Sequence, residues 1–187
     1  MRLIGGVAET IRLIACLALV AVSVHVVSVL MVPLLSRADA YSLVSRLAPE
    51  LQVTKLDPRS RLIDAMEDPD ISATVCAFDL AGGPVKLTLP VSPDGFSSIA
   101  LHQEGGGAFF ALSNSAAENG RIEVVALTPG QALDRAAEDD EDNPSGEVRA
   151  VASRSRGFAV FRSLALLPSQ RDAAAALVAG ARCVRAE

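Results

Sequence analysis

The sequence predicts an α+β protein: an N-terminal transmembrane helix, then an antiparallel β-rich domain, sandwich-like or a curved sheet, with a C-terminal helix. Three observations predict it. An uncharged apolar run lies near the N-terminus, short strand-like segments separated by tight turns fill the middle, and an Ala-rich segment lies near the end. We expect a cytoplasmic N-terminus (1–12), the transmembrane helix (13–35), a helical or irregular connector (36–70) and the β-rich domain (71–187).

The membrane helix is predicted from Leu13 to Leu35, a stretch without Asp, Glu, Lys or Arg. At 1.5 Å per residue it is long enough to cross a hydrocarbon core of roughly 30 Å. Arg2 and Arg12 precede it, which predicts a cytoplasmic N-terminus and an exported C-terminus. His25 lies mid-span, where an ionisable residue is a functional candidate, although a neutral, hydrogen-bonded His is the favoured interpretation.

Two other N-terminal readings compete with the anchor. Ala38-Asp39-Ala40 has the A-x-A form that a signal peptidase can cut. The apolar run is longer than the roughly 7–15 residues typical of a signal peptide, so an uncleaved anchor is favoured over cleavage after Ala40. A lipoprotein modified at Cys16 is rejected because the apolar run follows that residue instead of preceding it.

Alternating apolar and polar residues, bounded by Gly, Pro and Asn turns, predict seven strands. The expected strands are 74–80, 85–89, 96–101, 108–112, 121–127, 147–152 and 157–166. A short helix is expected over 40–47. A second helix runs from Thr128, its cap, with Pro129 at the first helical position, to Ala137. The last helix is expected from Pro168 to about Cys183.

Composition excludes several classes of function. The net charge is −5 and only two Lys occur, which argues against nucleic acid binding because phosphate contacts need clustered cations. No G-x-S-x-G is present, and "EGGGA" lacks the Lys-Ser/Thr of a phosphate loop. No His/Cys cluster has metal-ligand spacing. The sequence therefore predicts no cofactor, no metal and no catalytic set.

Cys76 and Cys183 are the cysteines outside the apolar run. In an exported domain they are expected to form a disulfide that ties the first strand to the C-terminal helix. Two independent buried thiols are the alternative.

The run "EDDED", Glu138 to Asp142, is most simply a solvated loop because adjacent like charges repel. A divalent-cation site at its carboxylates is the sharper hypothesis. A third reading lets the acids meet nearby arginines or a partner. The candidate binding residues are three of those acids, one arginine and the one His of the predicted domain: Asp139, Asp140, Asp142, Arg149 and His102. As a base, His102 would have to work with Ser97 or Ser98, earlier on the same predicted strand.

Three blocks, "ATVCAFDLAGGPVKLTLP", "FSSIALHQEGGGAFFALSNSAAENGRIEVVALTPGQ" and "DDEDNPSGEVRAVASRSRGFAVFRSLALLPSQRDAA", followed by a late Cys, resemble small membrane-anchored members of the bacterial family called domain of unknown function 1254. The resemblance covers about 20–183. It implies an inner-membrane anchor, a β-rich periplasmic domain and a companion domain, number 1214, on another chain; it implies no activity. Positions matching the family are fold determinants or site residues: Phe78, Asp79, Gly83, Pro84, His102, Asp139, Asp140, Asp142, Arg149, Gly157 and Phe158.

The expected function is that of a single-pass inner-membrane protein with a periplasmic domain that binds an envelope protein and is not an enzyme. The alternative is a small-ligand- or cation-binding domain, or a hydrolase using His102.

Overall fold

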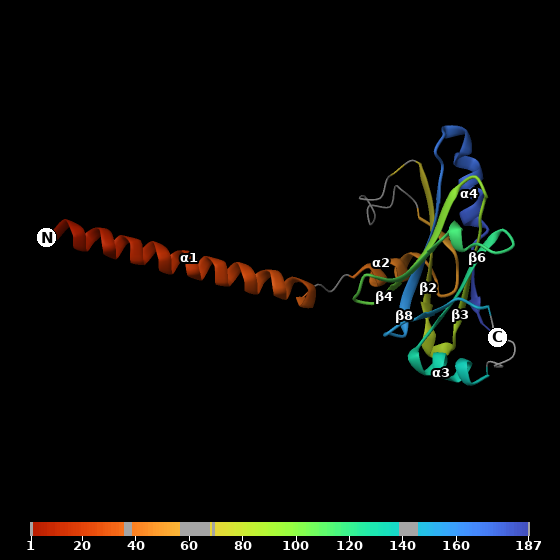
Figure 1. The fold of residues 1–187 in the computed structure, drawn as a ribbon, viewed down its shortest axis with the longest axis horizontal. Helices are drawn as coiled ribbons and strands as arrows, with labels where there is room; N and C mark the ends of the chain where they lie inside the picture. Colours follow the sequence, from red (N-terminus) through yellow and green to blue (C-terminus); the bar gives the residue numbers. More distant parts are fainter. Residues whose placement is uncertain (1, 36–38, 57–67, 69, 139–145, 187) are drawn as a thin grey trace. The chain divides into compact units, whose positions relative to one another are not determined.

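The computed structural model describes residues 2–35, 39–56, 68, 70–138 and 146–186. It divides into two compact units, Met1–Arg37 and Ala38–Glu187. Helix α2 and strand β1, which fall in the stretch expected to be a connector, belong to the second unit (Figure 1).

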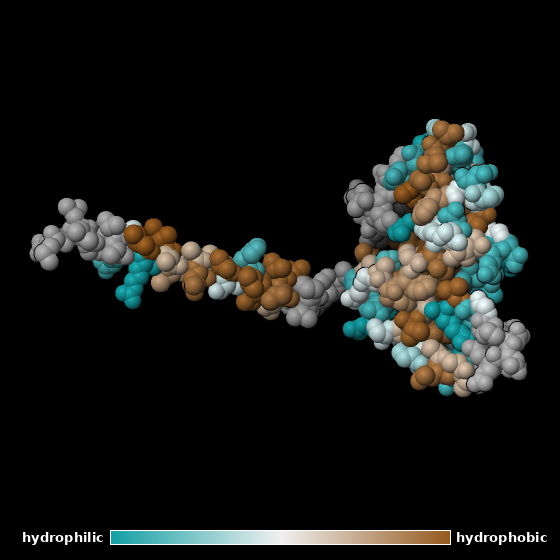
Figure 2. Space-filling view, viewed as in Figure 1, coloured by the Kyte–Doolittle hydropathy of each residue, from teal (hydrophilic) through white to brown (hydrophobic). Residues whose placement is uncertain are grey.

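The first unit is the single helix α1 (Arg2–Leu35), which begins before the predicted Leu13 and ends where predicted. Its segment Glu9–Val32 is apolar and long enough to cross a membrane. The described side chains of this helix are exposed, and brown apolar residues dominate them in Figure 2. Such a helix in water would leave a large apolar surface unpartnered.

The second unit contains two sheets. The five-stranded sheet has the order β1-β2-β8-β4-β5, and the four-stranded sheet has the order β7-β6-β3-β9. All neighbours are antiparallel except β6 and β7, which are parallel. The strands are β1 (Thr54–Lys55), β2 (Ile71–Asp79), β3 (Val85–Pro90), β4 (Phe96–Gln103), β5 (Ala108–Ser113), β6 (Arg121–Leu127), β7 (Arg149–Val151), β8 (Arg156–Leu164) and β9 (Arg182–Arg185).

One hydrophobic core lies between the two sheets. Strand side chains alternate between faces, so β3 buries every second residue, while β2 and β8 are buried on both faces. The largest fully buried side chains of this core include Phe78 and Phe161 from the five-stranded sheet and Leu87 and Ile122 from the four-stranded sheet. The predicted α+β class with antiparallel sheets is confirmed, and the described strands form two open sheets and no closed barrel.

The disulfide joins the two sheets. Cys76 on β2 is bonded to Cys183 on β9, across a sequence separation of 107 residues. The pairing is as predicted, but Cys183 lies on a strand and not on the C-terminal helix. The short 3₁₀ turn η3 (Pro168–Gln170) leads into helix α4 (Arg171–Ala179), which ends with Gly180 as its C-cap. Within the core, Thr74 Oγ1 donates to the Val178 carbonyl of α4 at 3.1 Å.

A second, smaller cluster lies on the other face of the five-stranded sheet. Helix α2 (Ala40–Leu47) covers it, and Val44 and Ala48 pack there against Phe158 and Val160. Asp39 caps α2 by accepting a hydrogen bond from Ser42 N at 2.8 Å. The helix thus has a buried face as the sequence pattern predicted, and its cap belongs to the folded unit.

Helix α3 (Pro129–Glu138) connects β6 to β7, and this crossover explains why these two strands are parallel. Thr128 and Gln131 bond reciprocally at its start: Thr128 N donates to Gln131 Oε1 at 2.9 Å, and Gln131 N donates to Thr128 Oγ1 at 3.4 Å. This is the capping-box arrangement. The expected Thr cap and Pro at the first position are confirmed.

Several residues that match the family resemblance shape the end of the sheets near β9. Asp79 caps the 3₁₀ turn η1 (Leu80–Gly82) by accepting from Ala81 N at 2.9 Å, and Gly83 follows with φ of 117°, which favours Gly. Arg185 Nη1 donates to the carbonyls of Asp79 and Gly83, each at 2.8 Å. These residues are explained by local structure.

Candidate functional site

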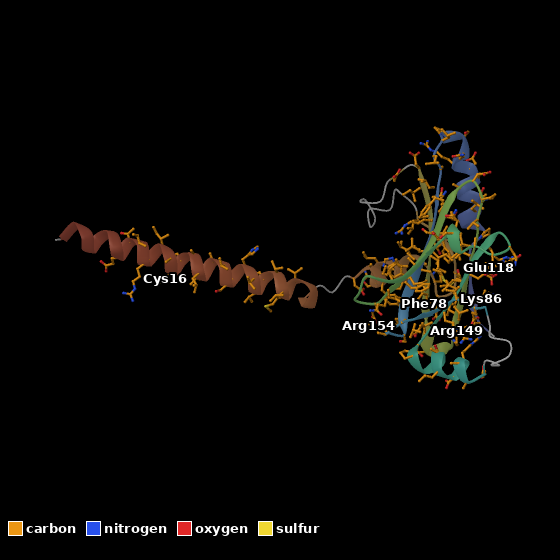
Figure 3. All side chains as sticks on the ribbon, viewed as in Figure 1. Cys16, Phe78, Lys86, Glu118, Arg149 and Arg154 are labelled. Carbon is orange, nitrogen blue, oxygen red and sulfur yellow. A yellow bond between two sulfur atoms is a disulfide. The ribbon has the colours of Figure 1, made fainter. Side chains whose placement is uncertain are left out.

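A cleft in the described part of the domain lies on the outer face of the four-stranded sheet. It encloses about 520 Å³ and is lined by strand β6, the loop after η2 (Asn114–Ala116) and the segment that leads into β7. Figure 3 shows Lys86 and Glu118 on this side of the domain. Polar side chains face outward here because the apolar half of each strand is turned to the core.

Alternating charges line this cleft. Lys86 and Glu123 occupy neighbouring strands, and the Lys86 Nζ–Glu123 Oε2 distance is 2.7 Å. Arg121, two residues along β6, approaches the other oxygen of Glu123 at 3.6 Å. About two-fifths of the Lys86 side chain is exposed, so these are surface ion pairs worth at most about 1 kcal/mol each. Their charges remain available to a ligand.

The opposite rim carries Glu147, which is bracketed by two cations. Arg149 Nε lies 3.2 Å from Glu147 Oε2, and Arg135 Nη1 lies 3.6 Å from the same oxygen. Arg149, a residue singled out from the sequence, therefore lies beside the cleft and holds one of its lining acids (Figure 3). The arrangement suits a ligand that carries both signs of charge or a polar protein surface.

His102 lies elsewhere, on the outer face of the five-stranded sheet. Its ring stacks on Phe158 with centroids 4.8 Å apart and planes 6° from parallel. Burial, and after it the positive charge of Arg162, holds the pKa of His102 below its ordinary value of 6.5. The ring is therefore neutral at pH 7 and packs as an aromatic side chain.

The two serines on β4 are not placed to work with His102. Ser97 is buried, and its hydroxyl donates to Ser163 Oγ at 3.3 Å. Ser98 faces the same side as His102 but four residues along the strand, about 13 Å away at roughly 3.3 Å per residue. A hydroxyl nucleophile must lie within hydrogen-bond reach of its base, so neither serine meets the requirement.

A small polar group joins α2 to the turn between β4 and β5. The Asp39 carboxylate accepts a hydrogen bond from Gly105 N at 2.7 Å, in addition to its cap bond. Burial raises the pKa of Asp39, but the bonds from Ser42 and Gly105 outweigh it, so its pKa lies below 3.8. Arg156 pairs with Glu104 at 2.9 Å and lies 5.8 Å from the Tyr41 ring centroid. These contacts fasten α2 to the sheet.

The sequence candidates do not form one site. Arg149 borders the charged cleft, His102 lies on the other sheet, and Asp139, Asp140 and Asp142 lie outside the described residues. In the described ranges, no group of three or more His, Cys, Asp or Glu side chains could hold a metal ion.

Sequence reasoning missed the cleft residues Lys86, Glu118, Arg121, Glu123 and Glu147. For Lys86, Arg121 and Glu123 the signal available was their outward position in alternating strands, whereas Glu118 and Glu147 lie outside strands and gave no such signal. Strand register, which sets Lys86 beside Val125 and Thr88 beside Glu123, cannot be read from that alternation.

Comparison with known proteins adds little. No family model matches the chain, and no curated protein matches it. A crystal structure of a Vibrio parahaemolyticus protein matches with 11% identity and a TM-score of 0.48, over 62% of this chain and 28% of that one. An uncharacterised Burkholderia cenocepacia protein matches with 15% identity and a TM-score of 0.43, over 62% and 32%.

The chain thus spans about a third or less of each of these proteins. Identities and TM-scores this low carry no argument about fold or function. The described residues define the class: an α+β protein with an N-terminal apolar helix, antiparallel sheets and a disulfide.

Proposed function

We propose that this chain is a single-pass protein of a bacterial inner membrane, of the family called domain of unknown function 1254, whose periplasmic domain binds an envelope protein and catalyses no reaction. Helix α1 is the anchor, with the N-terminus in the cytoplasm. A companion domain on another chain is the partner we expect. The observation that carries the proposal is the apolar segment Glu9–Val32, which at about 1.5 Å per residue is about 36 Å long.

The start of the folded unit supports retention of the anchor. Cleavage after Ala40 would remove Asp39, which bonds both Ser42 N and Gly105 N. Loss of an N-cap costs about 1 kcal/mol, and the loss here would also free α2 from the β4–β5 turn. A cut at that position would therefore damage the domain that it released.

The disulfide supports an exported domain. Disulfides persist in oxidising compartments such as the periplasm and are rare in the reducing cytosol. Cys76 and Cys183 are both buried, and their bond links the two sheets. Together with the positive residues that precede the span, it favours the orientation with the domain outside.

A binding role is supported by the charged cleft. Its lining offers Lys86, Arg121, Glu118, Glu123 and Glu147 around about 520 Å³, and none of the described residues that line it is a His, Cys, Ser or Thr. The neutral, stacked His102 on the other sheet is not paired with a nucleophile. Such a surface can recognise a partner by charge pattern.

The second candidate function is binding of a small ligand with both charge signs in the same cleft. The Lys86–Glu123–Arg121 arrangement favours it, because each group can exchange its present partner for a ligand group.

The proposal is tested in spheroplasts that express the chain with a C-terminal tag. We expect added protease to remove the C-terminal tag, while a tag at the N-terminus survives. We also expect the tagged protein to change its mobility between non-reducing and reducing gels, unless Cys76 is replaced by Ala. Cys16→Ala is the matched control, which leaves that shift intact. Protection of the C-terminal tag in intact spheroplasts and its digestion only after lysis would refute the orientation.

The binding role needs its own experiment. Cross-linking from the periplasmic side should trap one envelope protein, and the charge reversal Lys86→Glu should weaken the capture. Unchanged capture in this variant would exclude the cleft as the contact surface.

A further inference from the structure

Strand β5 is an open edge that differs from the other edges of the two sheets. It pairs with β4 on one side and with no described strand on the other. Its sequence, Ala-Phe-Phe-Ala-Leu-Ser, contains no charge and no Pro. Proteins usually protect an edge with charges, Pro or extreme shortness, because free N–H and C=O groups attract another strand.

The other described edges have that protection. Strand β1 is only two residues long and ends in Lys55. Strand β7 is three residues long and begins with Arg149. Strand β9 carries Arg182 and Arg185 within four residues.

The hydrogen-bond alternation shows which residues of β5 face the open side. Glu104 N donates to the Arg156 carbonyl at 2.9 Å, so this cross-strand pair is a hydrogen-bonded one. Alternate residues of β4 therefore bond β8, and the residues between them, including Leu101 and Ile99, bond β5. The partners of those two are Phe110 and Leu112.

It follows that Ala111 and Ser113 direct their backbone N–H and C=O groups away from β4. The register shift between Leu101 and His102 leaves Phe109 as an extra residue, so the regular edge runs from Phe110 to Ser113. Ala111 is exposed at the centre of the strand. A docking strand would meet backbone groups there without displacing a large side chain.

We propose that β5 pairs antiparallel with β5 of a second copy of this chain, about a two-fold axis through Ala111. In this register Ala111 of one copy lies opposite Ala111 of the other copy, and Phe110 lies opposite Leu112 of the other copy. Both apolar residues are partly buried against the core, so the pairing would extend the core across the edge. The proposal goes beyond partner binding at the cleft and does not depend on it.

The absence of charge on β5 favours a second copy of this chain as the strand that pairs with it. An isologous pair sets a strand against itself, so any charge near the axis meets a like charge. The uncharged β5 escapes that penalty, whereas β9 paired with itself would bring arginines together. The small side chain on the axis also allows the two backbones to approach.

The first experiment uses the full-length chain with Cys16→Ser, because Cys16 is a free exposed thiol that could cross-link by itself. In the proposed register the two copies of Ala111 have Cα atoms about 5.5 Å apart, within disulfide reach. Ala111→Cys should give a covalent dimer under mild oxidation.

The matched control is Ala108→Cys on the same strand, which is also exposed. In that register position 108 faces position 114, so the two copies of residue 108 are six residues out of step, about 20 Å apart. We expect at least a tenfold lower dimer yield. Equal yields at both positions, no dimer at Ala111, or a cross-link from position 111 to a different protein would each overturn the proposal.

A second experiment needs no added cysteine. Two full-length copies with different tags should co-precipitate, and Ala111→Lys should abolish this by setting two ammonium groups opposite each other. Ala137→Lys, the same change on exposed α3, should leave it intact. Co-precipitation that survives Ala111→Lys would place the association elsewhere and refute the pairing. Capture of the envelope partner and its response to Lys86→Glu are measured separately, so failure of the pairing can be told from failure of the proposed function.

Discussion

Gly157 offers a sharp test of the packing within the five-stranded sheet, because its close neighbours His102 and Phe78 lie on strands of that same sheet. A Cβ atom added to Gly157 would lie 2.5 Å from the His102 carbonyl oxygen and 2.8 Å from Cε2 and Cζ of Phe78. Contacts below 3 Å are not tolerated by real Cβ atoms, so the backbone of β4 and the Phe78 ring would both have to move. Phe78 is 1% exposed, and the carbonyl belongs to the β4–β8 pairing, so neither group can move freely.

Gly157→Ala should therefore destabilise the domain, although Ala normally suits a strand better than Gly. Overpacking typically costs about 1–3 kcal/mol, and two rigid neighbours place this site near 3 kcal/mol. For a domain of this size that is a fall in Tm of roughly 6–12 °C.

The assay is chemical denaturation of the domain that begins at Ala38, followed by circular dichroism. Gly107→Ala is the matched control, because a Cβ there meets nothing within 4 Å. Phe78→Leu should recover part of the loss in the double variant, since it removes ring atoms but not the carbonyl. A Gly157→Ala domain as stable as the wild type would refute this reading of the core.

Three further predictions concern the same domain. Replacing Cys76 and Cys183 together by Ala should cost about 2–5 kcal/mol, because the closed loop is long; an unchanged denaturation midpoint would contradict this. Since burial and then Arg162 lower the pKa of His102, the unfolded chain takes up the proton more readily. Stability should be constant above about pH 6.5 and fall below it, and His102→Gln should flatten that fall in denaturation at neutral and mildly acidic pH. Arg185→Lys should cost about 1–2 kcal/mol, because Lys cannot bond both carbonyls and Glu50 as the fork does; equal unfolding energies would disprove it.

Much of the fold could be predicted from alternation and turn residues. The strands around "VKLTL" and "RIEVVAL" have apolar residues at every second position, and the structure forms β3 and β6 there. Strand β1 could not be predicted, because two residues, Thr54 and Lys55, show no period.

Two other errors had available signals. Gly is typical of helix ends, so Gly180 was an available stop signal for the last helix, which the Ala-rich run instead predicted to continue to about Cys183. The helix from Pro129 between two strands indicated a crossover and hence a parallel pair, which the prediction of purely antiparallel sheets overlooked.

The candidate site was less accessible from sequence than the fold. Single residues such as Arg149 could be named, but the grouping of Lys86, Glu123 and Glu147 depends on strand register and on the segment 146–148, which runs beside β6 into β7. His102 could be named from the sequence as a rare ionisable residue, but its role as an aromatic ring stacked on Phe158 is seen only in the structure.

The measurement that tests the account most directly is alkaline carbonate extraction of membranes, with detection of a C-terminal tag. If α1 is an uncleaved anchor, the tag stays in the pellet on a full-length chain of about 19.4 kDa plus the tag. A soluble product shorter by about 40 residues, which a cut after Ala40 would give, would contradict the anchor and the role that we assign to Asp39.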